Sequence, residues 1–159
     1  RGLDTRRVNR DEKLKSISKE TTFFEDTSDP DLLDGHIWRL SEQVADRAKA
    51  KRLSGRTVTL KLKKGDFQLV TRRHALSDPT QLTDRIYRAA RDLFDHAGTN
   101  GPFRLIGVGI SDLAPEDQAD LAQDLLDPEA NRRAAAELAT DAIRAKFGAE
   151  AIIKGRALR

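Results

Sequence analysis

The sequence has no cysteine and no methionine, and its three histidines, His36, His74 and His96, are widely separated. Without cysteine, a disulfide scaffold, a thiolate zinc site and a cysteine nucleophile are all excluded. Three scattered histidines do not form a metal motif. We therefore predict no catalytic residue, no metal ligand and no cofactor for this chain.

Long apolar runs are also missing. No stretch approaches the roughly 18 residues that a membrane span needs, and the arginine-rich start lacks the apolar core of a secretory signal. A length of 159 residues suits one domain with a tail and is too short for an enzyme with separate cofactor and substrate domains. We expect a monomeric, cytoplasmic protein that contacts no membrane.

Charge is distributed unevenly along the chain, although the net charge is only +3. Residues 1–112 hold 22 basic and 17 acidic side chains, whereas residues 113–159 hold 7 and 9. The stretch 56–73 has six basic residues and one acid, while 115–129 has six acids and no base. This change of sign predicts a domain boundary. The predicted units are a linker at 1–14, a domain at 15–114, an acidic linker at 115–130 and a helical tail at 131–159.

Hydrophobic periodicity predicts four strands and two helices in the domain. In the strand 56–64, Val58, Leu60 and Leu62 alternate with threonine and lysine, so one face is buried and the other is wet and basic. The predicted strands are 15–24, 56–64, 67–74 and 103–111, and the helices are 31–53 and a second that begins at 78–80. Their order, β-α-β-β-α-β, predicts an α+β fold with a four-stranded antiparallel sheet and two helices on one face.

Glycines and apolar spacing predict further local features. Gly55 is expected just past the first helix in a left-handed conformation, and Gly65-Asp66 is expected to form the hairpin turn. Residues 131–147 are expected to form a helical extension that ends at Gly148. Its apolar stripe, which would pack on the domain, on the rest of a larger protein or on nothing, consists of Leu138, Ala142, Ile143 and Phe147.

The sheet face opposite the helices needs an explanation, because polar and basic residues are predicted there. The expected outward residues are Thr57, Thr59, Lys61, Lys63, Arg72, His74, Leu105, Gly107 and Gly109. One interpretation is ordinary solvation of an antiparallel sheet. The other is a phosphate-binding surface, in which cations supply charge and hydroxyls and backbone amides supply directional donors. Outward glycines would let a DNA backbone approach closely, although they also mark bulges.

The kind of nucleic acid follows from what this face lacks. No aromatic residue is predicted on it, which counts against single-strand and RNA readers that stack bases on aromatic rings. Neither helix presents a face of Asn, Gln or Arg for reading base edges in a groove. The pattern therefore predicts duplex affinity without sequence preference.

Three strings together resemble the little finger domain of bacterial Y-family lesion-bypass polymerases: KSISKETTF at 15–23, VTLKLKKGDFQLVTRR at 58–73 and FRLIGVGISDL at 103–113. RGLDTRRV at the start resembles the tether from the thumb, and DAIRAKFG with GRAL resembles the C-terminal extension of some members. The resemblance implies that the open sheet grips primer-template phosphates. The DNA-binding residues that it implies are Lys15, Ser16, Ser18, Lys61, Lys63, Arg72, His74, Arg104, Leu105, Gly107 and Gly109. Some relatives carry arginine at the position of Gly109, so this chain would depend more on backbone amides there.

The resemblance also implies a catalytic parent, an error-prone DNA-directed DNA polymerase whose palm carboxylates hold two Mg²⁺ ions. This sequence shows no palm, fingers or thumb string, so we expect the chain alone to be inactive. The acids of 116–129 do not replace a palm, because nothing in their segment would bring them together around a metal.

A sliding clamp is a second candidate partner. Bacterial lesion-bypass polymerases carry a peptide that resembles Gln-x-Asp-Leu-Phe, and two registers of it compete here. The register Gln118 to Ala122 keeps the Gln, Asp and Leu but ends in alanine. The favoured register keeps the apolar pair that would fill the clamp pocket, and it comprises Gln123, Asp124, Leu125 and Leu126. An acidic linker whose leucines cover a helix would give the same pattern.

Two alternatives to a DNA-gripping polymerase domain stay open from the sequence. One is an interaction module of a catalytically inactive polymerase paralogue, which binds the clamp and partner proteins. The presence of palm carboxylates in the parent protein would distinguish an active polymerase from this inactive paralogue. The other is an unrelated α+β RNA-binding module, which a preference for single-stranded RNA would reveal.

Overall fold

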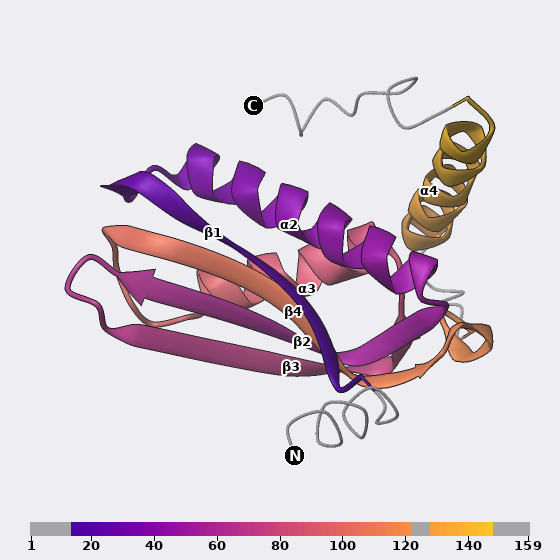
Figure 1. The fold of residues 1–159 in the computed structure, drawn as a ribbon, viewed down its shortest axis with the longest axis horizontal. Helices are drawn as coiled ribbons and strands as arrows, with labels where there is room; N and C mark the ends of the chain where they lie inside the picture. Colours follow the sequence, from indigo (N-terminus) through magenta and orange to yellow (C-terminus); the bar gives the residue numbers. More distant parts are fainter. Residues whose placement is uncertain (1–13, 122–127, 148–159) are drawn as a thin grey trace, which may run out of the picture.

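The computed structural model describes residues 14–121 and 128–147. It contains an antiparallel sheet in the order β1-β4-β2-β3, with α2 and α3 on one side (Figure 1). The elements are β1 (Ser16–Thr27), α2 (Pro30–Ala50), β2 (Leu53–Lys64), β3 (Leu69–Thr80), α3 (Thr83–Asp95), β4 (Phe103–Pro115), the 3-10 helix η1 (Glu116–Gln118) and α4 (Pro128–Phe147). The predicted α+β class and β-α-β-β-α-β order are confirmed.

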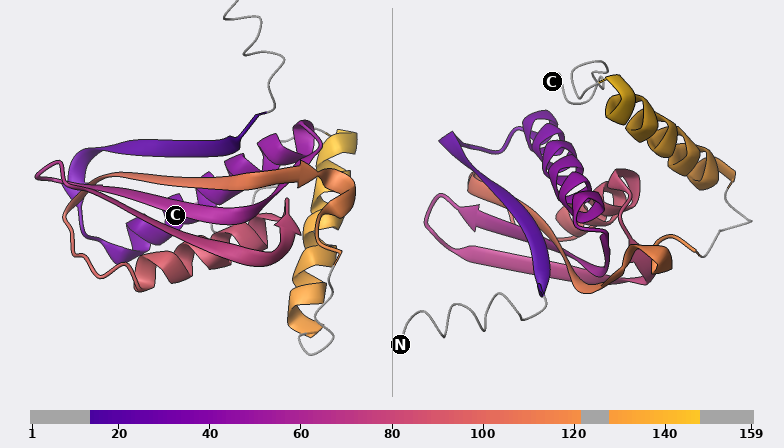
Figure 2. Two further views of the ribbon diagram at one scale, coloured as in Figure 1. Left: turned by 90° about the horizontal axis from the view of Figure 1, so that it is seen from below. Right: turned by 45° about the vertical axis from the view of Figure 1, so that its right-hand side comes forward.

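The strands form one layer and α2 with α3 forms the other, as Figure 2 shows from below. On the helix-covered face, Val58, Leu60 and Leu62 of β2 are fully buried. Ile106 and Ile110 of β4 pack into the same core. The predicted inward faces of β2 and β4 are therefore correct. No described element covers the other face of the sheet, which we call the open face.

Helix α2 begins at Pro30, one residue before the predicted start, and Asp29 caps it. The Asp29 carboxylate accepts a hydrogen bond of 3.0 Å from the backbone N–H of Asp31, which satisfies one of the free donors at the helix start. Its end differs from the prediction, because the left-handed residue is Arg52, with φ 57°. Gly55 lies inside β2 instead. A Cβ there would stand 2.6 Å from the Cβ of Ile110, so close packing requires the glycine.

The β2–β3 hairpin also differs from the prediction. The N–H of Lys64 donates to the carbonyl of Gln68 at 2.9 Å, so three residues form the loop. Phe67, with φ 70°, takes the left-handed position, and Gly65 does not. A three-residue loop of this kind ends with a left-handed residue, whereas a two-residue turn on Gly65-Asp66 would not. The strands also run longer than predicted, because β3 continues to Thr80 and β4 to Pro115.

Helix α4 stands at one end of the helical layer, beside the end of α2 (Figures 1 and 2). Its apolar stripe does not pack on the domain, because Leu138, Ile143 and Phe147 are 56%, 42% and 66% exposed, whereas packing on the rest of a larger protein or on nothing stays open. The buried residue is Glu137, at 5% exposure. The tail therefore docks on the domain through a polar face. No helix in the described part of the chain is long and apolar enough to cross a membrane.

Candidate functional site

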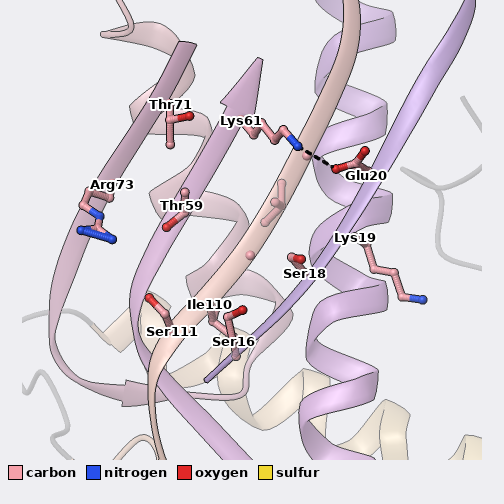
Figure 3. A pocket seen from close by; sticks show the side chains of 13 residues that line it. Ser16, Ser18, Lys19, Glu20, Thr59, Lys61, Thr71, Arg73, Ile110 and Ser111 are labelled. Carbon is pink, nitrogen blue, oxygen red and sulfur yellow. Dashed lines mark hydrogen bonds and ion pairs between the residues drawn. The ribbon is translucent and has the colours of Figure 1, made fainter. Parts of the chain in front are cut away.

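The open face is organised by the strand register into rows of four residues, one from each strand. Antiparallel pairing places every second residue of a strand on this face. The four rows, written from β1 through β4 and β2 to β3, are Ser16-Ser111-Thr57-Ala75, Ser18-Gly109-Thr59-Arg73, Glu20-Gly107-Lys61-Thr71 and Thr22-Leu105-Lys63-Leu69. Figure 3 shows the residues of the second and third rows, with Ser16 and Ser111 of the first row. The face is thus hydroxyl-rich at one end and more cationic and apolar toward the hairpin.

A shallow hollow of about 300 Å³ lies over the two middle rows and extends to Ser16 and Ser111 of the first row. Ser18, Thr59 and Arg73 line it in the row that contains Gly109, which we call the Gly109 row. Two hydroxyls and a guanidinium are the donor types that bind phosphate oxygens. Arg73 is exposed and makes no ion pair with the described residues. This row can therefore receive an anion without first losing an internal contact.

The glycines of β4 act differently from the prediction. Their backbone amides were expected to contact DNA, but β4 lies between β1 and β2, so these amides take part in ladders with those two strands. Donation of backbone N–H groups to DNA from Gly107 and Gly109 is therefore not supported. A Cβ at Gly109 would stand 2.9 Å from the Cβ of Ser18, so the close approach of β1 alone requires this glycine. Because Gly107 and Gly109 have no side chains, no side chain fills the hollow above these two positions.

Arg72 and His74 are not on the open face, so their predicted placement is wrong. They pair with Leu60 and Val58, whose side chains are in the core, and therefore point to the helix side of this edge strand. Arg72 donates to the carbonyl of Ala97 at 2.8 Å. The cation that β3 contributes to the open face is Arg73. Val70 is 7% exposed and belongs to the core. If Val70 had been predicted to lie in the core, the alternation along β3 would have placed Arg73 on the open face.

The remaining predicted residues lie at the two ends of the face. Ser16 and Ser18 are exposed on β1, and Lys15 precedes that strand. Toward the hairpin, Lys63 shares its row with Leu105, which is 7% exposed. Lys63 makes no ion pair with the described part of the chain and is available to a ligand.

Arg104 lies beyond the rows. It is the extra residue where Lys63 pairs with Leu105 and Lys64 with Phe103, which makes a bulge. Its guanidinium lies 4.5 Å from the centre of the exposed Phe67 ring and 3.7 Å from Asp26. The structure therefore places Arg104 at the hairpin tip and not among the four rows of the open face.

Sequence reasoning missed an acid on this face. The Glu20 carboxylate lies 3.1 Å from the Lys61 ammonium, and the pair bridges β1 and β2 across Gly107 (Figure 3). The outward position of Glu20 follows from the alternation with Ser16 and Ser18. Its partner follows only from the strand order, which places β4 between β1 and β2.

The predicted clamp-binding residues Gln123, Asp124, Leu125 and Leu126 lie outside the described residues. In the competing register, the Asp120 carboxylate is held within the fold, because it accepts hydrogen bonds from Thr80 Oγ1 at 2.7 Å and from Arg85 at 2.7 Å. A carboxylate held in this way is not available to a partner. Within 14–121 and 128–147, no group of three His, Asp or Glu side chains could hold a metal ion.

Sequence comparison identifies relatives of this chain. A model of the impB/mucB/samB family C-terminal domain matches residues 14–125. DNA polymerase IV of Brucella melitensis biotype 1 is 48% identical over 155 residues, which cover 98% of this chain and 35% of that protein. DNA polymerase IV of Caulobacter vibrioides is 39% identical over 158 residues, or 99% of this chain and 39% of that protein. The chain spans little more than a third of the length of these relatives.

Solved structures share the fold. The little finger domain of PolIV, in a complex with the beta-clamp processivity factor, superposes with a TM-score of 0.51 at 27% identity, covering 69% of this chain and 97% of that one. The Dbh DNA polymerase in a post-insertion binary complex superposes with a TM-score of 0.55 at 13% identity, covering 71% of this chain and 35% of that one. The second match concerns the fold alone.

Proposed function

We propose that this chain, which belongs to the impB/mucB/samB family of C-terminal domains, grips the phosphate backbone of primer-template duplex without reading its sequence. It is the little finger of a Y-family translesion polymerase, by family and by fold. The observation that carries the proposal is the open face, where hydroxyls surround a hollow and Arg73 and Lys63 stand without ion-pair partners among the described residues. Cations and hydroxyls without base-reading groups supply affinity that does not depend on sequence.

The shape of the site favours duplex over single strands. In the four rows there is no aromatic side chain on which a base could stack. Phe67 and Phe24 are exposed, but Phe67 lies at the hairpin tip and Phe24 lies in β1 beyond the four rows. Helices α2 and α3 lie on the other side of the sheet (Figure 2), so neither can enter a groove of DNA bound to the open face.

The parent of such a domain is a DNA polymerase, and this chain contributes binding rather than chemistry. The Mg²⁺ ions of that reaction find no set of ligands among the described residues, and we assign no catalytic step to them. A domain that holds chromosomal primer-template DNA in a bacterium works in the cytoplasm, as a monomer within its polymerase.

Two neighbouring arginines give a matched test. Arg73 faces the hollow, whereas Arg72 is bound to the Ala97 carbonyl on the opposite side of the same strand. Arg73→Glu should weaken duplex binding at least tenfold, because it replaces an attractive charge by a repulsive one at the phosphates. Arg72→Glu changes net charge equally and should have a much smaller effect. Fluorescence anisotropy with a labelled duplex measures both, and equal losses would refute the assignment to the open face.

Clamp binding is a second proposed function. It is supported by the likeness to a little finger solved with the beta-clamp processivity factor. Here the apolar pair Leu125 and Leu126 would enter the clamp pocket. Their replacement by alanine should abolish binding of the purified clamp, while Leu121→Ala, which removes a neighbouring leucine that is 68% exposed, should not. Clamp binding that survives the double substitution would place the contact elsewhere.

A further inference from the structure

We propose that Glu20 sets the affinity of the open face by occupying Lys61 until a DNA phosphate displaces it. This inference rests on the proposed function, because it concerns the same surface. Glu20 thereby acts as an internal competitor for the ligand, and Lys61 becomes a contact that forms only when a phosphate replaces the carboxylate.

The strand order creates this competition. Glu20 on β1 and Lys61 on β2 both pair with Gly107 on the intervening strand β4. Because Gly107 has no side chain, the carboxylate and the ammonium meet above it at 3.1 Å. A Cβ at Gly107 would stand 3.1 Å from the Cβ of Glu20 and 3.6 Å from that of Lys61, beneath the ion pair. The pair therefore covers Gly107 and closes this part of the sheet to a phosphate while it is intact.

The ion pair is weak enough to open. The side chains of Lys61 and Glu20 are 41% and 51% exposed, and ion pairs with such exposure contribute about 1 kcal/mol or less. A carboxylate and a phosphate oxygen are chemically similar acceptors for the same ammonium. Exchange of one for the other keeps Lys61 paired and costs little, whereas the presence of Glu20 lowers the net attraction of the whole face.

The neighbouring row shows the opposite arrangement. Ser18, Gly109, Thr59 and Arg73 include no acid, so an anion there competes with nothing among the described residues. Glu20 is the one carboxylate in the four described rows. The open face thus combines a free anion seat in the Gly109 row with a contact that is blocked until binding.

The test measures duplex affinity of the full chain at several salt concentrations. Glu20→Gln should lower the dissociation constant at least about threefold at low salt, because the competing carboxylate is removed, and should leave the slope of the salt dependence close to that of the unmodified chain, because Lys61 contacts a phosphate in both complexes. Glu25→Gln is the matched control, since it removes the same charge from the same strand outside the four rows and should give a smaller gain. An unchanged or weaker Glu20→Gln, or one equal to Glu25→Gln, overturns the proposal.

A double-mutant cycle tests the role of Lys61 directly. In a Lys61→Met background, Glu20→Gln should give a smaller gain than it gives in the unmodified chain, because the competition for Lys61 has been removed and only the repulsion between the carboxylate and the phosphates is left. A full gain in that background would overturn the competition mechanism. The Arg73→Glu variant distinguishes a failure of the Glu20 inference from a failure of the proposed DNA binding. If Arg73→Glu weakens binding and Glu20→Gln is neutral, only this inference fails; if Arg73→Glu is also without effect, the proposed function fails with it.

Discussion

Lysine and arginine side chains have different partners on the two sides of the sheet. On the helix side, basic residues are held by carboxylates at short distances, as between Arg91 and Asp34 at 2.6 Å or Arg85 and Asp120 at 2.7 Å. On the open face, Arg73 and Lys63 have no such partner among the described residues, and Lys61 has only the exposed Glu20. The comparison shows which cations hold the fold together and which are available to a ligand.

Lys49 illustrates the helix side. Burial alone would lower its pKa, but Glu137 and Asp141, at 2.8 and 2.6 Å, more than offset this, and the pKa of Lys49 is raised. Arg85 follows the same pattern, since Asp78 and Asp120 raise its pKa despite burial. A cation stabilised in this way would have to lose its carboxylates before it could bind a phosphate.

The largest expected effect separates the two faces by packing. Ile106→Asp should unfold the domain, because an unpaired charge in the core costs several kcal/mol. Thr71→Asp places the same carboxylate on the open face and should leave the fold intact. Circular dichroism and urea denaturation compare the two variants. A folded Ile106→Asp variant would mean that the faces of β4 are assigned the wrong way round.

The second effect separates the faces by charge. Combined reversal of Lys61, Lys63 and Arg73 to Glu should weaken duplex binding at least about a hundredfold, because several phosphate contacts become repulsive. On the helix side, Arg88 makes an exposed ion pair with Asp84 of its own helix, and Arg88→Glu should change duplex affinity by less than about threefold. Binding measured on folded protein checks both. A triple variant that binds normally would exclude the open face as the DNA site.

The third effect concerns the docking of α4. The Glu137 carboxylate accepts from the N–H groups of Thr83 and Asp84, at 2.7 and 3.1 Å, and so caps α3 from outside its own sequence. Glu137→Ala should cost about 2 kcal/mol and make residues 128–147 sensitive to protease. Leu138→Ala, at the next position, should change little because Leu138 is exposed. Equal protease resistance in all three proteins would contradict this docking.

The smallest effect depends on pH. Burial, and then the charge of Arg39, lower the pKa of His36 below its ordinary value of 6.5. The fold thus favours the neutral ring, and the stability it contributes is present above pH 6.5 and lost as the pH falls through the lower folded pKa. His36→Asn should therefore gain stability relative to the unmodified chain as the pH falls from 7 to 5.

His96 also titrates in this pH range, so the stability of His36→Asn has to be compared with that of the unmodified chain at each pH. Its hydrogen bond to the Asp92 carbonyl, and then the Asp92 charge, raise its pKa, so its contribution to stability has the opposite sign. The variant comparison cancels this contribution. Proton NMR titration checks His36 directly, and a pKa at or above 6.5 would contradict the assigned environment.

The sequence predicted the faces of β2 and β4 because apolar residues alternate with threonine and lysine in 57–63 and with glycine in 106–110. It misassigned β3 because that strand has apolar residues at both parities, Leu69 beside Val70 and Ala75 beside Leu76. The parity there is set by the hairpin loop, where Phe67 takes the left-handed position that a glycine was expected to fill. One misplaced turn residue therefore exchanged Arg72 for Arg73 in the predicted site.

Local sequence patterns could not predict contacts between segments that are distant in the chain. The helical tail was predicted, but its docking depends on Glu137 meeting the start of α3, 53 and 54 residues away in the chain. The pairing of Glu20 with Lys61 likewise requires the strand order β1-β4-β2, which periodicity does not determine. In both cases the informative residue was an acid that local sequence interprets as a solvated side chain.

The central claim is that the open face binds duplex phosphates, and one titration tests it most directly. The chain is titrated into a fluorescent primer-template duplex at 50 and 200 mM salt, beside a single strand of equal length and duplexes of different sequence. The account predicts duplex binding that weakens at least tenfold from the lower to the higher salt concentration. This binding should be tighter than binding to the single strand and should not depend on the sequence of the duplex. Absence of duplex binding at low salt, or a preference for the single strand, would contradict it.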